Sequence, residues 1–382
     1  MPLLLFRQGQ GFFLVLAVGD GAFQHLALAA AAGAVLAAIR QADAGTDGCR
    51  QHGFAIVAGK LPTARLYSYL ESHTIPQMND KNLFRKSMPI GAPGRAFGKP
   101  RLLIIGCGDV GMRLLPLVRG HFRVFAVTSQ PARREELRAA GAVPIVADLD
   151  RPDSLKRLAG LAHWVVHLAP PQAEGEKDRR TRNLTAILPD SAALVYVSTS
   201  GVYGDCQGAW VDETRPVRPQ NARARRRVDA ESTLRAWARR SGSRLAILRA
   251  PGIYAADRLP VERLKKGTPA LCADDDVYTN HVHADDLARM VALALFRSRP
   301  NRVYHAVDDT DLKMGEYFDA VADAFGLPRS PRLPRAELAK AVSPMLLSFM
   351  SESRRLANSR VRKELRVRLR YPDVHALLRA QA

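Results

Sequence analysis

The sequence predicts an α/β fold built on a doubly wound parallel sheet, the Rossmann architecture, followed by a smaller C-terminal subdomain. Two observations carry this prediction. Short apolar runs of strand length alternate with segments of helical length from Arg101 onward, and the first run ends in a glycine-rich turn. Buried apolar strands joined by helix-length segments indicate a parallel sheet covered on both faces, and right-handed crossovers make such a sheet doubly wound.

The same alternation places the individual elements. We expect strands at residues 102–105, 123–127, 143–146, 164–168, 194–198 and 245–248. Helices are expected at residues 112–118, 132–140, 154–158, 174–187 and 223–239. After residue 251 the pattern loosens into helices at 285–295 and 314–325, one strand at 303–307, and a basic helical region from residue 335 to the C-terminus. We therefore expect a nucleotide-binding domain over 98–255 and a mostly substrate-side subdomain over 256–382, with 303–307 returning to the main sheet.

Residues 1–97 differ from the rest of the chain. Within residues 11–39, Asp20 is the only formally charged side chain, so a signal peptide or a membrane anchor is one interpretation. Asp20 and Gln24 interrupt that span, however, and alanine contributes little transfer free energy, which disfavours a transmembrane helix. We expect an N-terminal extension of unknown role that is poorly ordered or that results from a translation start set too early.

The chain carries 57 lysine and arginine residues against 37 aspartate and glutamate residues, a formal net charge of +20. Such a field attracts anions, whether a phosphorylated cofactor, an acidic substrate or nucleic acid. The densest basic run, residues 223–227, has no interleaved aromatic side chain on which bases could stack, which disfavours nucleic acid. The four cysteines (Cys49, Cys107, Cys206 and Cys272) lie far apart, with neither disulfide nor metal-binding spacing. We therefore expect a reducing, cytoplasmic location and no metal site.

The most informative motif, Gly106-Cys-Gly-Asp-Val-Gly111, follows the first expected strand. The first glycine permits a tight turn, the second leaves room for a diphosphate against the backbone, and the third lets the next helix approach the strand. The helix N-terminus then offers unpaired N–H groups to the phosphates. The candidate dinucleotide-binding residues are therefore Gly106, Gly108, Asp109, Val110 and Gly111. The alternative is a glycine-rich turn that binds nothing.

The ends of the second and third expected strands bear on which dinucleotide binds. A site that prefers NAD usually ends the second strand with Asp or Glu, which binds the adenosine ribose. Here that strand ends at Thr128-Ser129 and Arg133 follows, which suits the 2′-phosphate of NADP, although this arginine also fits an exposed first turn of a helix. NADP is thus the expected cofactor, with NAD as the alternative. After the third strand, Asp148, next to Leu149, either accepts from the adenine amino group or caps the following helix.

From about residue 101 to residue 371, the sequence resembles the extended short-chain dehydrogenases/reductases of the NAD-dependent epimerase/dehydratase type. Four motifs carry the resemblance, in the family's order and at about its spacing. They are Gly106-Cys-Gly-Asp-Val-Gly111, Val197-Ser-Thr-Ser-Gly-Val-Tyr-Gly204, Leu248-Arg-Ala-Pro-Gly-Ile-Tyr254 and Asn280-His-Val-His-Ala-Asp-Asp-Leu-Ala288. The resemblance implies a Rossmann fold, a bound nicotinamide dinucleotide and a small-molecule substrate.

The resemblance also implies roles for particular residues. Thr199 matches the family's catalytic Ser or Thr, whose hydroxyl hydrogen-bonds a substrate oxygen; alternatively, it only satisfies backbone groups at the end of a strand. Leu168 and Ala169 match the loop that lines the cofactor ribose.

In the last of the four motifs, Asp285 or Asp286 is expected to cap the following helix or to lie in its first turn. His281 and His283 either face a substrate or serve as structural side chains. The residue types alone do not decide between these two roles.

The chain departs from the family at its catalytic signature, Tyr-x-x-x-Lys with a Glu four residues beyond the Lys. Aligning on Glu231 puts Arg223 at the Tyr position and Arg227 at the Lys position. Arginine stays protonated, so it cannot exchange the proton that the tyrosine exchanges. Arg227 can still hold the nicotinamide ribose, and Arg223 can bind an anionic group or stabilise an oxyanion. Tyr203 is a candidate substitute acid.

This pattern resembles the atypical branch of the family, which keeps the nucleotide site and lacks the Tyr-x-x-x-Lys pair. The leading hypothesis is an oxidoreductase or epimerase/dehydratase-like enzyme that binds NAD(P) and acts on a small polar or anionic substrate. The alternative is a catalytically impaired NADP-binding sensor or regulatory protein. Thr199 and residues 251–254 favour the enzyme, and the missing tyrosine favours the sensor. Neither the substrate nor the oligomeric state follows from the sequence.

Overall fold

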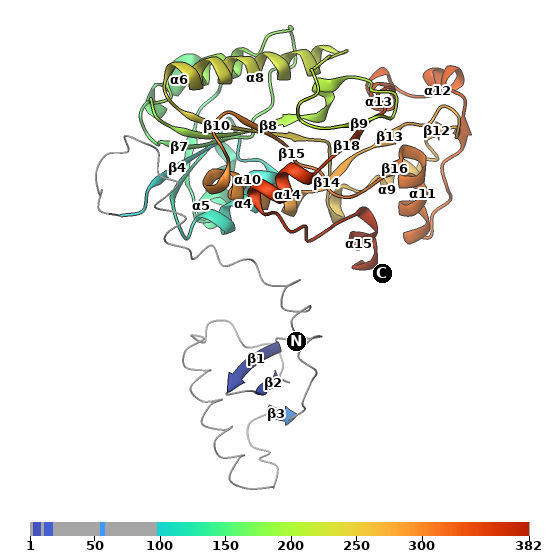
Figure 1. Ribbon diagram of the computed structural model, residues 1–382, viewed down its shortest axis with the longest axis horizontal. Coiled ribbons are helices and arrows are strands. Elements are labelled where there is room, and N and C mark those ends of the chain that lie inside the picture. Colours follow the sequence, from blue (N-terminus) through green and yellow to red (C-terminus); the bar gives the residue numbers. More distant parts are fainter. Residues whose placement is uncertain (1–2, 9–10, 18–53, 58–97, 382) are drawn as a thin grey trace. The chain divides into compact units, whose positions relative to one another are not determined.

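The computed structural model describes residues 3–8, 11–17, 54–57 and 98–381 (Figure 1). The chain divides into two compact units, Met1–Asn79 and Asp80–Ala382. In the first unit, the strands β1 (Leu3–Gln8), β2 (Gly11–Ala17) and β3 (Phe54–Val57) form an antiparallel sheet in the order β1-β2-β3. Of the apolar segment at residues 11–39, the structure describes β2, and the remainder lies outside the described residues. No helix in the described ranges combines the length and the apolar character needed to cross a bilayer.

A seven-stranded parallel sheet forms the centre of the second unit, which confirms the predicted fold. Its strands are β4 (Arg101–Ile105), β5 (Arg123–Thr128), β6 (Val143–Val146), β7 (Trp164–His167), β8 (Ala193–Thr199), β10 (Arg244–Ala250) and β15 (Arg302–His305). They run in the order β15-β10-β8-β7-β4-β5-β6. The chain reverses its direction of winding between β4 and β7, which is where doubly wound sheets bind ligands at the carboxyl ends of their strands.

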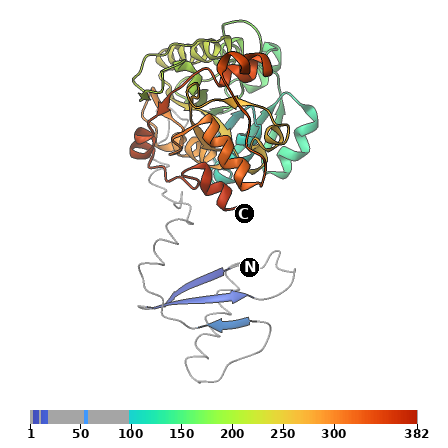
Figure 2. The same ribbon diagram turned by 90° about the vertical axis from the view of Figure 1, so that its right-hand side faces the viewer.

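Helices cover both faces of this sheet (Figure 1). They include α4 (Asp109–Val118), α5 (Arg134–Ala139), α6 (Pro152–Leu155), α7 (Arg179–Thr185), α8 (Ala222–Arg240), α10 (Ala284–Arg297) and α14 (Ser359–Leu365), with 3-10 turns η1 (Pro131–Arg133), η2 (Lys156–Leu158) and η3 (Ser200–Tyr203). On one face, Leu234 and Trp237 of α8 join a buried cluster with Leu103 and Ile105 of β4. Figure 2 shows the yellow-green helix α8 along this side, and α10 packs with α4 against the opposite face.

Helix α7 is shorter than the helix expected at residues 174–187. Its N-cap is Asp178, whose carboxylate accepts from the backbone N–H of Thr181 at 3.2 Å. The preceding loop is held by the side-chain amide of Gln172, which donates to the carbonyls of Glu174 and Lys177. A cap that satisfies otherwise unpaired N–H groups fixes where a helix begins, so the helix starts five residues later than expected.

The smaller subdomain is built from short strand pairs and helices around a second core. The pairs are β11 (Gly252–Tyr254) with β14 (His281–His283), β12 (Ala270–Leu271) with β17 (Arg332–Leu333), β13 (Tyr278–Thr279) with β16 (Leu312–Lys313), and β18 (Arg355–Leu356) with β9 (Trp210–Val211). The helical elements are η4 (Ala256–Arg258), α9 (Val261–Lys265), α11 (Met314–Ala324), α12 (Arg335–Ala341), α13 (Pro344–Phe349) and α15 (Val374–Arg379). The expectation of one basic helical region after residue 335 is wrong in detail. Pro344 starts a new helix, and Arg366 ends α14 in the left-handed conformation.

A buried ion pair ties α8 to the sheet. The guanidinium of Arg249, at the carboxyl end of β10, binds the carboxylate of Glu231 through two hydrogen bonds of 3.0 and 2.7 Å. Both residues are only 4% exposed. Two parallel N–H···O bonds are the geometry in which Arg and a carboxylate interact most strongly.

We expect Glu231→Gln to lower the free energy of unfolding by roughly 3–5 kcal/mol, because it leaves the buried charge of Arg249 without a counter-charge. Chemical denaturation followed by circular dichroism measures this change. Glu262→Gln, which removes a surface carboxylate paired with Lys265, serves as the control and should leave the midpoint unchanged. Equal midpoints for the two variants would contradict the structural role of the buried pair.

Candidate dinucleotide and substrate site

The glycine turn after β4 lies directly against the loop after β7. Gly106 has a φ of +79°, and a Cβ at this position would lie 2.7 Å from backbone atoms of Ala169. Leu168 and Ala169 both donate backbone N–H groups to the carbonyl of Ile105, at 2.9 and 3.1 Å. Only glycine fits this contact, and the two loops predicted to hold the cofactor are therefore adjacent.

Helix α4 presents an accessible N-terminus immediately after this turn. Its N-cap is Gly108, and a Cβ there would meet no atom within 4 Å. The first bond from a helical N–H runs from Met112 to the carbonyl of Gly108, so the N–H groups of Asp109, Val110 and Gly111 have no partner along the helix. A diphosphate therefore has room against the backbone of Gly108 and can accept hydrogen bonds from the N–H groups at the start of the helix.

Arg133 reaches the glycine turn from the 3-10 turn after β5. One of its terminal nitrogens donates to the carbonyl of Cys107 at 2.6 Å, and its Nε and other terminal nitrogen bind the carboxylate of Glu136. Ser129, the first residue after β5, is exposed. The side chain of Arg133 is thus anchored next to the turn, and Glu136 offsets part of its charge.

Asp148 does not cap the helix that follows it, so that alternative is wrong. One carboxylate oxygen accepts from the backbone N–H of Asp150 at 2.9 Å, while the N-cap of α6 is Arg151, without a side-chain capping bond. Leu149 is buried in the cluster beneath α7 and α8, and its carbonyl accepts from the amide of Asn183. The side chain of Leu149 therefore belongs to the core.

Thr199 lies at the carboxyl end of β8, partly exposed. Its hydroxyl oxygen accepts from the backbone N–H of Gly201 at 3.3 Å and caps the turn η3. This bond is long and uses one lone pair, so the hydroxyl proton and a second lone pair stay available to a ligand.

Arg223 and Arg227 lie one turn apart on α8. Arg227 donates from one nitrogen to the hydroxyl of Tyr196 at 2.9 Å and to the carbonyl of Val197 at 3.0 Å, which holds the guanidinium against the carboxyl half of β8. Partial burial lowers the pKa of Arg223, and the nearby carboxylate of Glu352 opposes that shift. Arg223 stays charged, because the ordinary pKa of arginine is far above neutrality.

The structure argues against Tyr203 as a substitute acid. The side chain is 1% exposed, and burial raises the pKa of its hydroxyl to about 12. The hydroxyl accepts from Arg249 at 2.7 Å and lies 2.6 Å from Nε2 of His305. His305 uses Nδ1 to donate to the carbonyl of Ala357, so Nε2 is the acceptor and the hydroxyl of Tyr203 donates its hydrogen bond to it.

The motif after residue 280 combines two expected features with an unexpected cap. Asp285 and Asp286 lie in the first turn of α10, as predicted, but the N-cap is His283, whose Nδ1 accepts from the backbone N–H of Asp285 at 3.2 Å. The ring centroids of His283 and Tyr371 lie 3.7 Å apart, with the rings tilted by 30°. His281 is buried against Tyr317, with ring centroids 4.2 Å apart. Both histidines occupy structural positions.

One further wall of this region, the segment 352–354, carries no motif that would have predicted its place here. Glu352 accepts from the side-chain amide of Asn221, the N-cap of α8, at 3.1 Å and from Arg354 at 2.8 Å. Arg354 also donates to the carbonyl of Gly204, and Ser353 receives backbone bonds from the loop after η3. These contacts place a carboxylate beside Arg223 from a segment more than a hundred residues away in the sequence.

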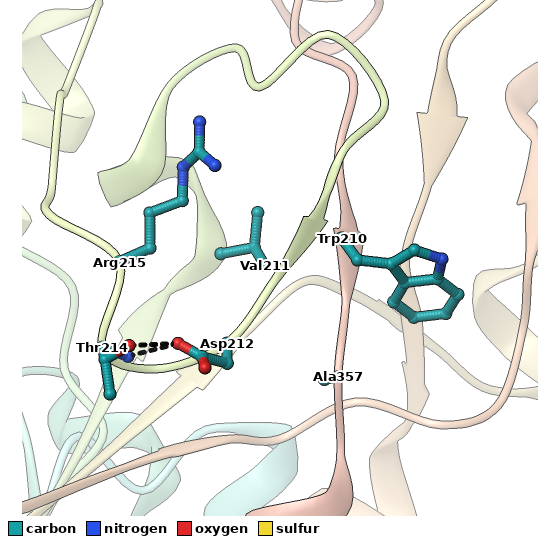
Figure 3. A pocket seen from close by; sticks show the side chains of 6 residues that line it. All are labelled: Trp210, Val211, Asp212, Thr214, Arg215 and Ala357. Atoms are coloured by element: carbon teal, nitrogen blue, oxygen red, sulfur yellow. Dashed lines mark hydrogen bonds between the residues drawn. The ribbon is translucent and has the colours of Figure 1, made fainter.

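A separate cavity of about 440 Å³ lies at the β9–β18 pair (Figure 3). Its walls are Trp210, Val211, Asp212, Thr214, Arg215 and Ala357. The carboxylate of Asp212 binds the Thr214 backbone N–H and hydroxyl, which shapes one wall. None of the predicted site residues lines it. Among the described residues, no group of three or more His, Cys, Asp or Glu side chains is arranged to hold a metal ion.

The doubly wound sheet, the glycine turn and the accessible start of α4 define a nucleotide-binding α/β protein. A family model described as "NAD dependent epimerase/dehydratase family" matches residues 103–306, more than half of the chain. The chain belongs to this family.

Solved structures give the same architecture. A conserved protein of unknown function from Silicibacter pomeroyi is 30% identical, with a TM-score of 0.61 over 74% of this chain and 98% of that one. The UDP-glucose 4-epimerase of Thermotoga maritima, solved with UDP-glucose, is 18% identical, with a TM-score of 0.60 over 73% and 96%. A double mutant of the dTDP-glucose 4,6-dehydratase of Streptomyces venezuelae, solved with NAD, is 21% identical, with a TM-score of 0.59 over 73% and 95%. No curated protein matches the sequence. At these identities, the two enzymes establish a shared fold.

We expect Gly106→Ala to weaken dinucleotide binding at least tenfold. The new Cβ would lie 2.7 Å from the backbone of Ala169 at a positive φ, so the two loops must separate. Fluorescence titration with NADPH and NADH measures the loss. Gly120→Ala, whose Cβ meets no atom within 4 Å, is the matched control and should bind as the native chain does. Undiminished binding by the Gly106 variant would contradict the assignment of the turn.

Proposed function

We propose that this protein is an NAD(P)-dependent enzyme of the oxidoreductase or epimerase/dehydratase type that acts on a small polar or anionic substrate. The observation that carries the proposal is the cradle of bare backbone at Gly106 and Gly108, which opens onto unpaired N–H groups of α4. A nicotinamide dinucleotide bound there would supply hydride transfer. Binding of the dinucleotide, followed by turnover on a panel of carbonyl compounds and nucleotide sugars, tests it.

The residues proposed to act on the substrate come from β8 and α8. The hydroxyl of Thr199 hydrogen-bonds a substrate oxygen, and Arg223 binds a negative group of the substrate or stabilises charge that develops on that oxygen. Arg227, held at the carboxyl half of β8 by Val197, positions the ribose next to the nicotinamide. A fixed guanidinium can orient a ligand and stabilise an anion, although it transfers no proton.

We propose NADP as the preferred cofactor. No carboxylate follows β5 at Thr128 or Ser129, where one would repel a 2′-phosphate, and Arg133 is anchored beside the glycine turn. The bond between Arg133 and the carbonyl of Cys107 supports this choice, because a pre-oriented guanidinium loses little entropy on binding a phosphate.

A sensor or regulatory protein that binds NADP without turnover is the second candidate. The lack of a tyrosine at the family's catalytic position favours it, since Arg223 stands there and the hydroxyl of the nearby candidate Tyr203 is enclosed. NADPH binding without turnover on the whole panel would support the sensor over the enzyme.

The cofactor assignment predicts the response of Arg133→Ala. We expect the Kd for NADPH to rise about tenfold while the Kd for NADH changes less than threefold, because only NADPH carries the 2′-phosphate. Arg138→Ala is the control, since Arg138 pairs with Glu135 on the exposed side of α5. Equal losses of affinity for the two dinucleotides would show that Arg133 stabilises the glycine turn without binding the 2′-phosphate.

The substrate-site assignment predicts the response of Thr199→Ala and Arg223→Ala. We expect kcat/KM to fall by about 10²-fold or more in each variant with NADPH binding intact, because both side chains are proposed to act on the substrate. Tyr203→Phe is the control and should retain turnover, since its hydroxyl serves only Arg249 and His305. Loss of turnover in Tyr203→Phe alone, at a temperature where the variant is folded, would reverse the assignment.

A further inference from the structure

An ion-pair cluster lies at the first turn of α4, next to the proposed diphosphate site. The carboxylate of Asp109, the first residue of the helix, accepts from Nε of Arg113 at 3.1 Å. A terminal nitrogen of Arg258 also lies 3.3 Å from this carboxylate. Arg258 belongs to η4, the segment that leaves β11 for the smaller subdomain. The nucleotide-binding turn and the substrate-side chain are therefore joined through one carboxylate.

Arg113 is too heavily shared to neutralise Asp109 by itself. It also binds Asp285 at 2.6 Å and lies 3.7 Å from Asp257. Three carboxylates thus converge on one guanidinium. In the described part of the chain, Arg258 is the only other cationic side chain within 4.0 Å of Asp109.

A diphosphate at the helix N-terminus would meet this local excess of negative charge. The partial charge of the helix end is only about half a unit, which does not offset a full carboxylate one residue into the helix. The guanidinium of Arg258 makes an ion pair with Asp109 rather than a short hydrogen bond, and its side chain is 38% exposed. Its remaining N–H groups are therefore available to an anion on the solvent side.

We propose that Arg258 binds the diphosphate of the dinucleotide directly, so that one guanidinium bridges the phosphates and the carboxylate of Asp109. This contact would make the substrate-side segment η4 part of the cofactor site. Asp109 orients the guanidinium of Arg258. Arg258 in turn supplies positive charge to the phosphates, which Arg113 does not, because Arg113 is shared among three carboxylates. The inference rests on the proposed function, because it requires a dinucleotide at the glycine turn.

Titration of the full-length protein with ADP and NADPH tests the proposal. Arg258→Ala should raise the Kd of both ligands about tenfold, the loss of one charge-assisted contact. Arg258→Lys should recover part of that loss, and binding of adenosine, which has no phosphate, should not change. Lys266→Ala removes another exposed positive charge, at the C-terminal cap of α9 and eight residues beyond Arg258, and should change no Kd.

A double-mutant cycle with Asp109→Asn separates direct contact from neutralisation. Asp109→Asn alone should lower the Kd for ADP about threefold, because it removes the repelling carboxylate. Arg258→Ala should still weaken ADP binding several-fold in the Asp109→Asn background. Loss of the Arg258 effect in that background would overturn the proposal, since Arg258 would then act only through Asp109.

The outcomes also distinguish this inference from the proposed function. A native protein that binds neither NAD(H) nor NADP(H) would refute the proposed function. A native protein that binds a dinucleotide, together with an Arg258→Ala variant that is folded and binds ADP equally well, would refute the role of Arg258 alone. Melting temperature establishes that each variant is folded.

Discussion

The buried ion pair between Glu231 and Arg249 is the constraint on which the site depends. Removing two charges from water is costly, and the cost is offset only when each charge finds a partner in good geometry. Here the carboxylate accepts two bonds from one guanidinium, whose third nitrogen donates to the hydroxyl of Tyr203, and that hydroxyl donates to His305. This chain of contacts joins α8, β10, η3 and β15. The position of α8 along the sheet is therefore fixed by charge as well as by packing.

That fixed position explains where the unusual arginines lie. Arg223 and Arg227 precede Glu231 by two turns and one turn of the same helix, so all three side chains leave α8 on about the same face. The same chain of contacts engages the hydroxyl of Tyr203, which donates a hydrogen bond to His305. At the proposed substrate site, Arg223 and Arg227, which carry permanent charge, thus occupy the positions where the resemblance to the family implies Tyr and Lys.

The fold could be predicted closely because each part of it follows from local patterns. Every expected strand of the main sheet forms within about two residues of its predicted bounds, since apolar runs and glycine turns are local signals. The later start of α7, set by the cap at Asp178, and the broken helices after residue 335 depend on capping and backbone details that periodicity does not encode.

The glycine turn and Thr199 were found from motifs. Glu352 and Arg258 were missed because their partners, Asn221 and Asp109, lie far away in the sequence.

The net charge of +20 can be interpreted once the hydrogen-bond and ion-pair partners of the arginines are known. Much of the surface arginine is paired with carboxylates, as in the bonds of Arg180 to Asp150 and of Arg329 to Asp323. On the first turns of α8, by contrast, Arg226 donates to the carbonyl of Gly175 and Arg227 to that of Val197, which are neutral acceptors. A guanidinium bound to a carbonyl is oriented but keeps its full charge for the surroundings. On the same turns, Arg225 pairs with Glu176, and Glu352 lies near Arg223. Arg226 and Arg227 are thus the arginines held by neutral acceptors, and an anionic group on the proposed substrate would reduce the electrostatic repulsion between them.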